Sequence, residues 1–143
     1  MGARIAAKDV KEGQALPHWS YPVVREDLVR YANASGDGNP IHQDEEFAKS
    51  VGLPDVIAHG MHTMARMGQY VTDWTGDPGA LELFKTRFSA MVVVPADGGN
   101  TVTVAGKVAE TLEGDRVKID LVATTPDGAT VAKGEAIVAL GCQ

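Results

Sequence analysis

The second half of the chain alternates apolar and polar residues with a period of two, which restricts the possible folds more than any other feature of the sequence. Turn-forming residues separate the alternating runs at Glu113-Gly114-Asp115 and Pro126-Asp127-Gly128. The apolar positions of these runs are Val102, Val104, Val108, Val117, Ile119, Leu121, Ala136, Val138 and Leu140. Such runs, joined by short turns, predict antiparallel strands that each bury one face.

Two further strands are expected outside these runs. Residues 81–94 follow the turn-rich segment 75–80 and are predicted to form a strand. Residues 14–23 predict a strand at a sheet edge, because each of their two prolines lacks the N–H that a central strand would donate.

Helical periodicity replaces the alternation in the middle of the chain. Residues 24–35 predict one helix. Residues 40–51 predict a second, with Asn39 as its cap, Pro40 as its first residue and Gly52 as its left-handed stop. These two helices form an excursion between the first strand and the rest of the sheet.

A third helix is predicted over residues 59–74. Its expected buried stripe consists of Met61, Met64, Ala65, Gly68, Val71 and Thr72. His62 falls on another line with helical spacing and is assigned to a polar face. An antiparallel sheet wrapped around this central helix would bury the stripe, so residues 1–143 are predicted to be a single α+β domain. Pairing of two such sheets would cover the exposed edges.

The candidate chemistry lies in Gly36-Asp37-Gly38-Asn39-Pro40-Ile41-His42. The flanking glycines allow a tight loop, from which the carboxylate of Asp37 could meet His42 across one water molecule. A position in the first turn of a helix would disfavour an imidazolium, so His42 is expected to stay neutral near pH 7. Taken singly, Asp37 could merely stabilise its own turn and His42 could be a surface residue.

A second short segment, Ala58-His59-Gly60-Met61, opens the central helix. A glycine there leaves a backbone N–H available at a helix N-terminus, although close packing alone could also require it. His59 and His62 are spaced as metal ligands could be, but a zinc site needs a third ligand held nearby. A metal-free site that adds water is the interpretation preferred here.

The segment from Ser35 to Asp44 resembles the signature of the MaoC-like, or hydratase 2, family. Ala58-His59-Gly60-Met61, Arg87-Phe88 and Val94-Pro95-Ala96-Asp97 resemble later motifs of the same family. The resemblance covers almost the whole chain. Residues 70–74 and 76–79 look most like the catalytic B subunit of actinobacterial (3R)-hydroxyacyl-ACP dehydratases. One departure is Ala96-Asp97-Gly98, where the family often has Pro-Gly-Asp, and it affects only a turn.

The resemblance implies a hotdog fold and a hydro-lyase that interconverts (3R)-hydroxyacyl and trans-2-enoyl thioesters. Asp37 and His42 would then handle the water and its protons, and the Gly60 N–H would bind the thioester oxygen. The supporting or substrate-binding residues would be Ser35, Asn39, Ala58 and His59. No metal and no cofactor is expected beyond the thioester carrier, which is coenzyme A or acyl carrier protein (ACP).

Several alternatives stay open at this point. The chain could act in type II fatty-acid synthesis on ACP-bound substrates, or as a stand-alone (R)-specific enoyl-CoA hydratase. It could also be a non-catalytic acyl-binding hotdog subunit or a hotdog thioesterase. Its partner could be a second copy or a related hotdog subunit. Arg66, Lys85 and Arg87 are candidates for carrier binding.

Composition excludes other classes of function. A net charge of −6 and a pI of about 5.1 argue against a nucleic-acid partner. No basic run suggests a membrane surface, and no apolar run reaches the length of a membrane span. The single cysteine, Cys142, cannot form an intrachain disulfide. A cytoplasmic location is the resulting expectation.

Overall fold

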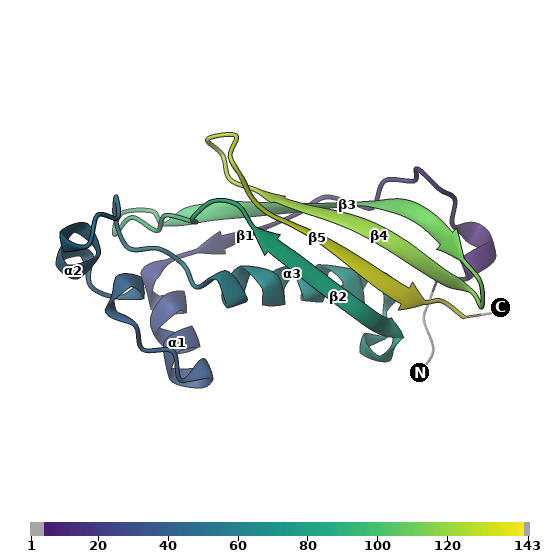
Figure 1. The fold of residues 1–143 in the computed structure, drawn as a ribbon, viewed down its shortest axis with the longest axis horizontal. Coiled ribbons are helices and arrows are strands. Elements are labelled where there is room, and N and C mark those ends of the chain that lie inside the picture. The colour runs from purple at the N-terminus through teal and green to yellow at the C-terminus, as the bar shows by residue number, and fades with distance from the viewer. Residues whose placement is uncertain (1–4, 142–143) are drawn as a thin grey trace.

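The structure, a computed structural model, describes residues 5–141. Its strands form one antiparallel sheet in the order β1-β3-β4-β5-β2. The strands are β1 (Trp19–Val23), β2 (Leu81–Phe88), β3 (Asn100–Leu112), β4 (Arg116–Thr124) and β5 (Thr130–Ala139). The helices are α1 (Arg25–Ser35), α2 (Glu45–Ser50) and α3 (Gly60–Thr75), with short 3-10 turns at Ala7–Asp9, Pro40–His42 and Pro78–Ala80. Helix α3 lies along one face of the sheet (Figure 1). This arrangement confirms the predicted α+β hotdog fold.

The alternating runs form β3, β4 and β5, as predicted. Their predicted apolar positions are all buried. The turns between these strands use left-handed backbone at Gly114, Asp115 and Gly128, as the turn residues indicated. Because side chains alternate across a strand, this burial determines the register of each pairing.

Strand β2 is shorter than the predicted 81–94. It ends at Phe88, the N–H groups of Ser89 and Ala90 still donate to Val131 O on β5, and the chain then leaves the sheet edge. Residues 92–94 instead pair with the segment that returns from the helical excursion: the N–H of Ala58 donates to Val92 O and the N–H of Val94 donates to Val56 O, each at 2.8 Å. Val92 and Val94 are therefore buried by a second short pairing rather than by the main sheet, whereas Met91 is exposed.

The buried face of α3 differs from the predicted stripe. Its buried residues are His62, Thr63, Met67, Tyr70, Val71 and Thr75. Met61 is 57% exposed and Ala65 is exposed, so that part of the prediction is wrong, as is the assignment of His62 to a polar face. The helix carries apolar residues on two faces. The face that fits the sheet is the one on which Met67 and Tyr70 pack against Gly134 and Gly106.

The predicted helix over 40–51 is divided into a 3-10 turn and α2. Asn39 caps the turn by accepting from the N–H of Ile41, and Asp44 caps α2 by accepting from the N–H of Phe47. Two caps five residues apart each start a turn of their own, which interrupts a continuous helix. Helix α1 agrees with the prediction to within one residue, and Gly52 is left-handed as expected.

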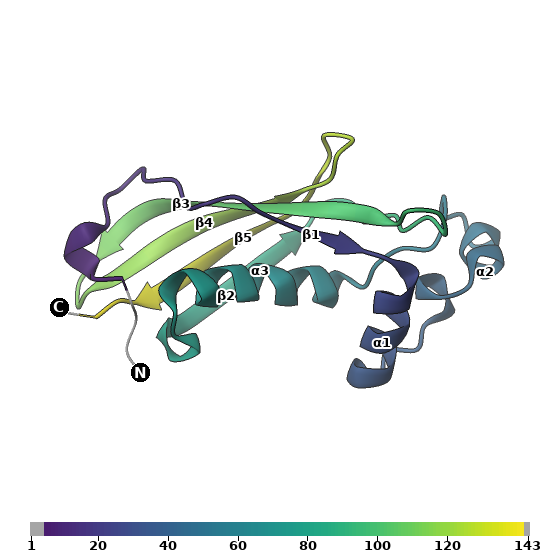
Figure 2. The same ribbon diagram turned by 180° about the vertical axis from the view of Figure 1, so that it is seen from behind.

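Arg25, at the start of α1, ties the helical excursion to the rest of the domain. Its guanidinium contacts Asp55 at 2.6 Å and Glu45 at 3.2 Å, and its Nε donates to Val94 O. These contacts join α1, α2 and the returning segment near the start of α3. Figure 2 shows α1 and α2 gathered beyond that end of α3. The loop that carries Asp37 and His42 is thereby held over the first turn of the central helix.

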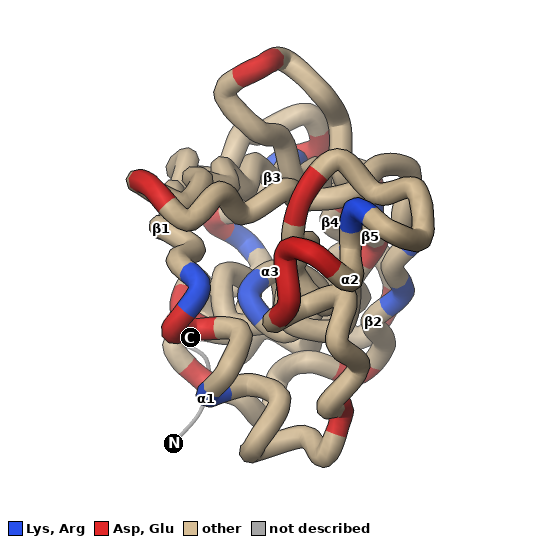
Figure 3. Tube along the Cα trace, turned by 90° about the vertical axis from the view of Figure 1, so that its left-hand side faces the viewer, with Lys and Arg blue, Asp and Glu red and all other residues tan. Residues whose placement is uncertain are grey.

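Within the described part of the chain, no helix combines the length and apolar character needed to cross a bilayer. The acidic residues are spread over the molecule, with a run of them at the start of α2 (Figure 3). Cys142 lies outside the described residues.

Candidate active site

His42 ends the 3-10 turn at Pro40–His42, and its side chain is buried. Its Nδ1 lies 2.6 Å from the backbone oxygen of Ile57. A carbonyl oxygen only accepts hydrogen bonds, so Nδ1 carries the proton and Nε2 keeps its lone pair. Burial lowers the pKa of His42, although the Ile57 bond opposes the shift. The imidazole is therefore held neutral mainly by burial, rather than by a helix dipole as the sequence suggested, because a three-residue turn has little dipole.

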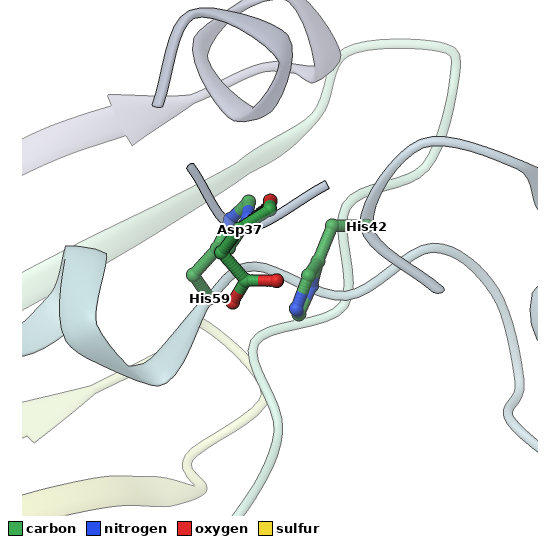
Figure 4. Close-up of side chains that lie close together, drawn as sticks. All are labelled: Asp37, His42 and His59. Carbon is green, nitrogen blue, oxygen red and sulfur yellow. Dashed lines mark hydrogen bonds between the residues drawn. The ribbon is translucent and has the colours of Figure 1, made fainter. Parts of the chain in front are cut away.

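Asp37 lies in the exposed loop between α1 and the 3-10 turn. Gly36, with φ of 81°, ends α1 in the left-handed conformation. The N–H of Asp37 donates to Ser35 Oγ, and its own Oδ1 accepts from the N–H of Asn39, both at 3.2 Å. These bonds fix the loop, and the other carboxylate oxygen of Asp37 has no hydrogen-bond partner within the described part of the chain. In Figure 4 the carboxylate points toward the ring of His42.

His59 contacts both of these residues. Its ring stacks on that of His42 with centroids 3.7 Å apart and planes 25° apart. Its Nε2 lies 3.1 Å from the backbone oxygen of Asp37, so Nε2–H is the donor. The ring of Tyr31 makes an edge-on contact with the ring of His59, with the two ring centroids 4.7 Å apart. His59 is thus the physical link between the loop of Asp37 and the ring of His42.

Asp37, His42 and His59 can each offer one ligand atom, and these three atoms lie within 4.8 Å of one another, which raises the question of a metal site. The stacked rings argue against one. Each imidazole lone pair lies in the plane of its own ring, so two nearly parallel rings direct their lone pairs side by side rather than toward a common point. The donor set fits acid–base chemistry better than metal binding.

A cavity of about 270 Å³ opens beside His42. Its lining residues are His42, Ile57, Ala58, Gly60, Thr63, Phe88, Ala90, Met91, Val92 and Val131. The wall is largely apolar, and its titratable group is His42. Asp37 and His59 adjoin the cavity through His42, whereas Ser35 and Asn39 support the loop from outside it. Such a cavity suits an acyl chain whose reacting end lies at the imidazole.

Gly60 is the first residue of α3, so its N–H has no acceptor within the helix. A Cβ added there would lie 3.3 Å from the ring of Phe88. The glycine therefore both leaves a donor at the positive end of the helix and makes room for an aromatic wall. Ala58 does not supply a second donor, because its N–H is bonded to Val92 O. It contributes wall surface only.

Sequence reasoning missed the cavity residues Thr63 and Met91, and the contact that Tyr31 makes with His59. Phe88 was noted as part of a motif but received no role. No local pattern could show these contacts, because they join segments that lie far apart in the chain.

Residues 8–125 match the MaoC like domain family. The chain is 34% identical to the 3-hydroxybutyryl-CoA dehydratase of Methylorubrum extorquens, covering 78% of this chain and 69% of that protein. It is 31% identical to the (R)-specific enoyl-CoA hydratase of Rhodospirillum rubrum, covering 72% of each. The chain belongs to the MaoC-like domain family.

Other relatives are much longer. The chain is 41% identical to the Mycobacterium tuberculosis 3-hydroxyacyl-thioester dehydratase X over half of its own length, but this spans only 25% of that protein. It spans 2% of the fatty acid synthase subunit beta of Gibberella zeae. Domains of this kind therefore occur both in short proteins and as small parts of large ones.

Solved structures agree with this assignment. A MaoC-like dehydratase superposes with a TM-score of 0.92 at 38% identity, over 95% of this chain and 42% of that one. The R-hydratase PhaJ1 of Pseudomonas aeruginosa gives 0.86 at 26% identity, over 99% and 89%. The HadBC complex of Mycobacterium tuberculosis, titled a 3R-hydroxyacyl-ACP dehydratase, gives 0.68 at 19% identity, over 88% and 95%, and shares the fold.

Proposed function

We propose that this chain catalyses the reversible dehydration of (3R)-hydroxyacyl thioesters to trans-2-enoyl thioesters. The observation that carries the proposal is the imidazole of His42, with its Nδ1 proton committed to Ile57 O and its Nε2 lone pair free. It lies beside the Asp37 carboxylate and lines an apolar cavity. The names of the two relatives support the same class of reaction, and the name of the (R)-specific enoyl-CoA hydratase supports the stereochemistry.

The reaction places three demands on the site. In hydration, water adds its oxygen to C3 and a proton is delivered to C2, so no electrons are exchanged with a cofactor. Asp37 and His42 hold the water and move its protons, acting as one coupled pair. Negative charge develops on the thioester oxygen, and the free N–H of Gly60 stabilises it. Loss of one such donor typically costs about 3–4 kcal/mol.

The proposed carrier is ACP in a type II fatty-acid synthesis system, with coenzyme A as the alternative. Relatives of both kinds support this choice: one is named for a CoA substrate, and a structural neighbour is titled an ACP dehydratase. Within this chain, the side chains that would contact the carrier are the features that could favour ACP or coenzyme A.

We further propose that β2 pairs with a second hotdog subunit. β2 lies at one edge of the sheet, and an unpaired edge strand of eight residues exposes backbone donors and acceptors. Phe88, the last residue of β2, and Met91 are exposed and line the cavity, and Met61 is exposed on the first turn of α3. The partner is either a second copy or a related subunit. Light scattering on the purified chain distinguishes a dimer from a monomer that lacks its partner.

Hydration of trans-2-butenoyl-CoA by the purified chain tests the reaction, followed by loss of absorbance of the conjugated thioester. The expected product is (3R)-hydroxybutyryl-CoA. Asp37→Asn keeps the Oδ1 that bonds to Asn39, so it should fold normally and lose about 10²–10⁴-fold in kcat. Asp73→Asn, an exposed carboxylate on α3, is the matched control and should keep full activity.

Other outcomes identify the alternatives. Release of free CoA thiol would show a thioesterase and overturn the proposal. An active Asp37→Asn enzyme would show that the acid–base pair is assigned incorrectly. The chain would be a non-catalytic partner if two results held. The folded chain alone would not hydrate the substrate, and its complex with a related hotdog subunit would stay active after Asp37→Asn.

A further inference from the structure

Two basic residues face each other across strands β2 and β5. Arg87 lies directly opposite Lys133 in the antiparallel register, so their side chains share one face of the sheet. Like charges in this position repel one another. Among residues 5–141 neither side chain forms an ion pair or a side-chain hydrogen bond, so the repulsion is not relieved within the described chain.

The neighbouring charges on the same face are neutralised. Lys85, two residues before Arg87, contacts Glu135 at 3.6 Å, and Lys118 contacts the same carboxylate at 3.4 Å. Glu135 is therefore already shared by two lysines. Arg66, another candidate for carrier binding, is also occupied: it bonds to Gln69 and lies over the ring of Tyr21. Of the three cations singled out in the sequence, Arg87 alone has no partner among the described residues.

Arg87 and Lys133 line a hollow of about 390 Å³, together with Ser89 and Thr130. All four residues are polar, which distinguishes this hollow from the apolar cavity beside His42. The Arg87 guanidinium, the Lys133 ammonium and the Thr130 hydroxyl present several hydrogen-bond donors and a net positive charge around one hollow, whereas the Ser89 hydroxyl already donates to Thr130 O. The ligand that this arrangement fits is a phosphate group.

The hollow and the candidate active site occupy opposite faces of the same short segment. Side chains alternate along β2, so Arg87 and Ser89 face the hollow while Phe88 and Ala90 line the cavity. On β5, Val131 lines the cavity and its neighbour Thr130 lines the hollow. Ser89 and Ala90 follow the last residue of β2 at the edge of the sheet, so a flexible arm can pass around the edge at these two residues, beyond the strand that would pair with a second subunit.

We infer that the hollow between Arg87 and Lys133 binds the phosphate of the phosphopantetheine arm on which the substrate is carried. This inference rests on the proposed function, because it assumes a thioester in the cavity. The phosphopantetheine phosphate is common to coenzyme A and ACP, so one site would serve both carriers. The phosphate would also neutralise the like-charge pair, which explains why two unpaired cations are tolerated there.

The test compares substrates with and without the phosphate. The hydration rates of trans-2-butenoyl-CoA and of the trans-2-butenoyl thioester of N-acetylcysteamine, which lacks a phosphate, are measured for the wild type, Arg87→Gln and Lys133→Gln. The readout is the ratio of the two kcat/KM values, which general damage to the enzyme leaves unchanged. Each variant should lower this ratio about 10-fold, through a higher KM for the CoA thioester.

Lys107→Gln is the matched control, since Lys107 is an exposed lysine on β3 that does not line the hollow. It should leave the ratio unchanged. The same comparison with butenoyl-ACP extends the test to the protein carrier, for which Arg87→Gln should raise KM in the same way. Raising the salt concentration should reduce the ratio in the wild type more than in either variant.

The outcomes separate the two proposals. If the wild type hydrates neither thioester, alone or together with a related hotdog subunit, the proposed function fails, and calorimetric titration with free CoA then tests the hollow alone. Equal affinity of the wild type and Arg87→Gln for CoA overturns the inference. If both thioesters are hydrated and the ratio is the same in Arg87→Gln and Lys133→Gln as in the wild type, the inference fails while the proposed function stands.

Discussion

The imidazole of His59 stacks on that of His42 at 3.7 Å while its Nε2–H donates to the backbone oxygen of Asp37. One residue thus sets the ring plane of His42 and holds the loop that carries Asp37. Its own Nδ1 is buried and has no hydrogen-bond partner among residues 5–141. His59 contacts both Asp37 and His42 but does not line the cavity. We therefore describe it as a positioning residue.

Replacing His59 should therefore impair turnover more than substrate binding. His59→Leu loses the bond to Asp37 O and allows the ring of His42 to turn, and we expect kcat to fall about 100-fold with KM little changed. His59→Gln keeps a side-chain donor and should recover part of the loss. Steady-state kinetics on the two variants checks this. Equal activity of His59→Leu and the wild type would contradict the positioning role.

The pH dependence of turnover should reflect the burial of His42. Burial lowers the pKa of this imidazole, and the charge of His59 lowers it further, whereas the bond to Ile57 O and the charge of Asp37 raise it. The base must be neutral, so activity is present above the lowered pKa and is lost as the pH falls through it. The acid limb of kcat/KM should lie below about pH 6.5, the ordinary value for histidine.

A pH–rate profile in buffers of constant ionic strength measures this limb. In His59→Leu the limb should move to higher pH, because one group that lowers the pKa of His42 is gone. An acid limb above the ordinary histidine value in the wild type would show that a different group is the essential base.

Gly60→Ala tests the start of α3. The new methyl group would lie 3.3 Å from the ring of Phe88, which is 46% exposed and so has room to move. We expect a folded protein in which the displaced ring reshapes the cavity and kcat/KM falls on the order of 10-fold. Combining it with Phe88→Leu should recover part of the activity.

Gly68→Ala is the control on the same helix. Its added methyl group would meet the ring of Phe84 at 3.5 Å, an ordinary contact, away from the cavity. This variant should keep its activity and gain up to about 1 kcal/mol in free energy of unfolding, since alanine favours a helix interior. Equal effects of the two substitutions on kcat/KM would argue against a special role for Gly60.

The buried face of α3 makes a prediction about folding. Met67 is fully buried against the sheet, so Met67→Asp should prevent folding, because an unpaired charge there has no compensating partner. Met64 is only half-buried, so Met64→Asp should still fold as a single chain, contrary to what the sequence pattern alone suggests. Circular dichroism and thermal melting of the two variants distinguish the cases. A native-like Met67→Asp protein would contradict the observed packing.

The sequence by itself determined strands β3, β4 and β5, the turns between them and the tight loop at Asp37. Period-two burial is a local pattern, and each of these strands has one apolar face, so only one register buries it. The spacing of Asp37 and His42 likewise anticipated that the two side chains would lie near each other. The Asn39 cap follows from its neighbours in the chain alone.

Tertiary structure decided the rest. Helix α3 carries apolar residues on two faces, and only the approach of Gly106 and Gly134 in the sheet selects the face with Met67 and Tyr70. The neutral state of His42 comes mainly from burial, and the stack with His59 joins segments separated in the chain by a whole helix. Such contacts depend on how distant segments pack together, which local periodicity and spacing do not describe.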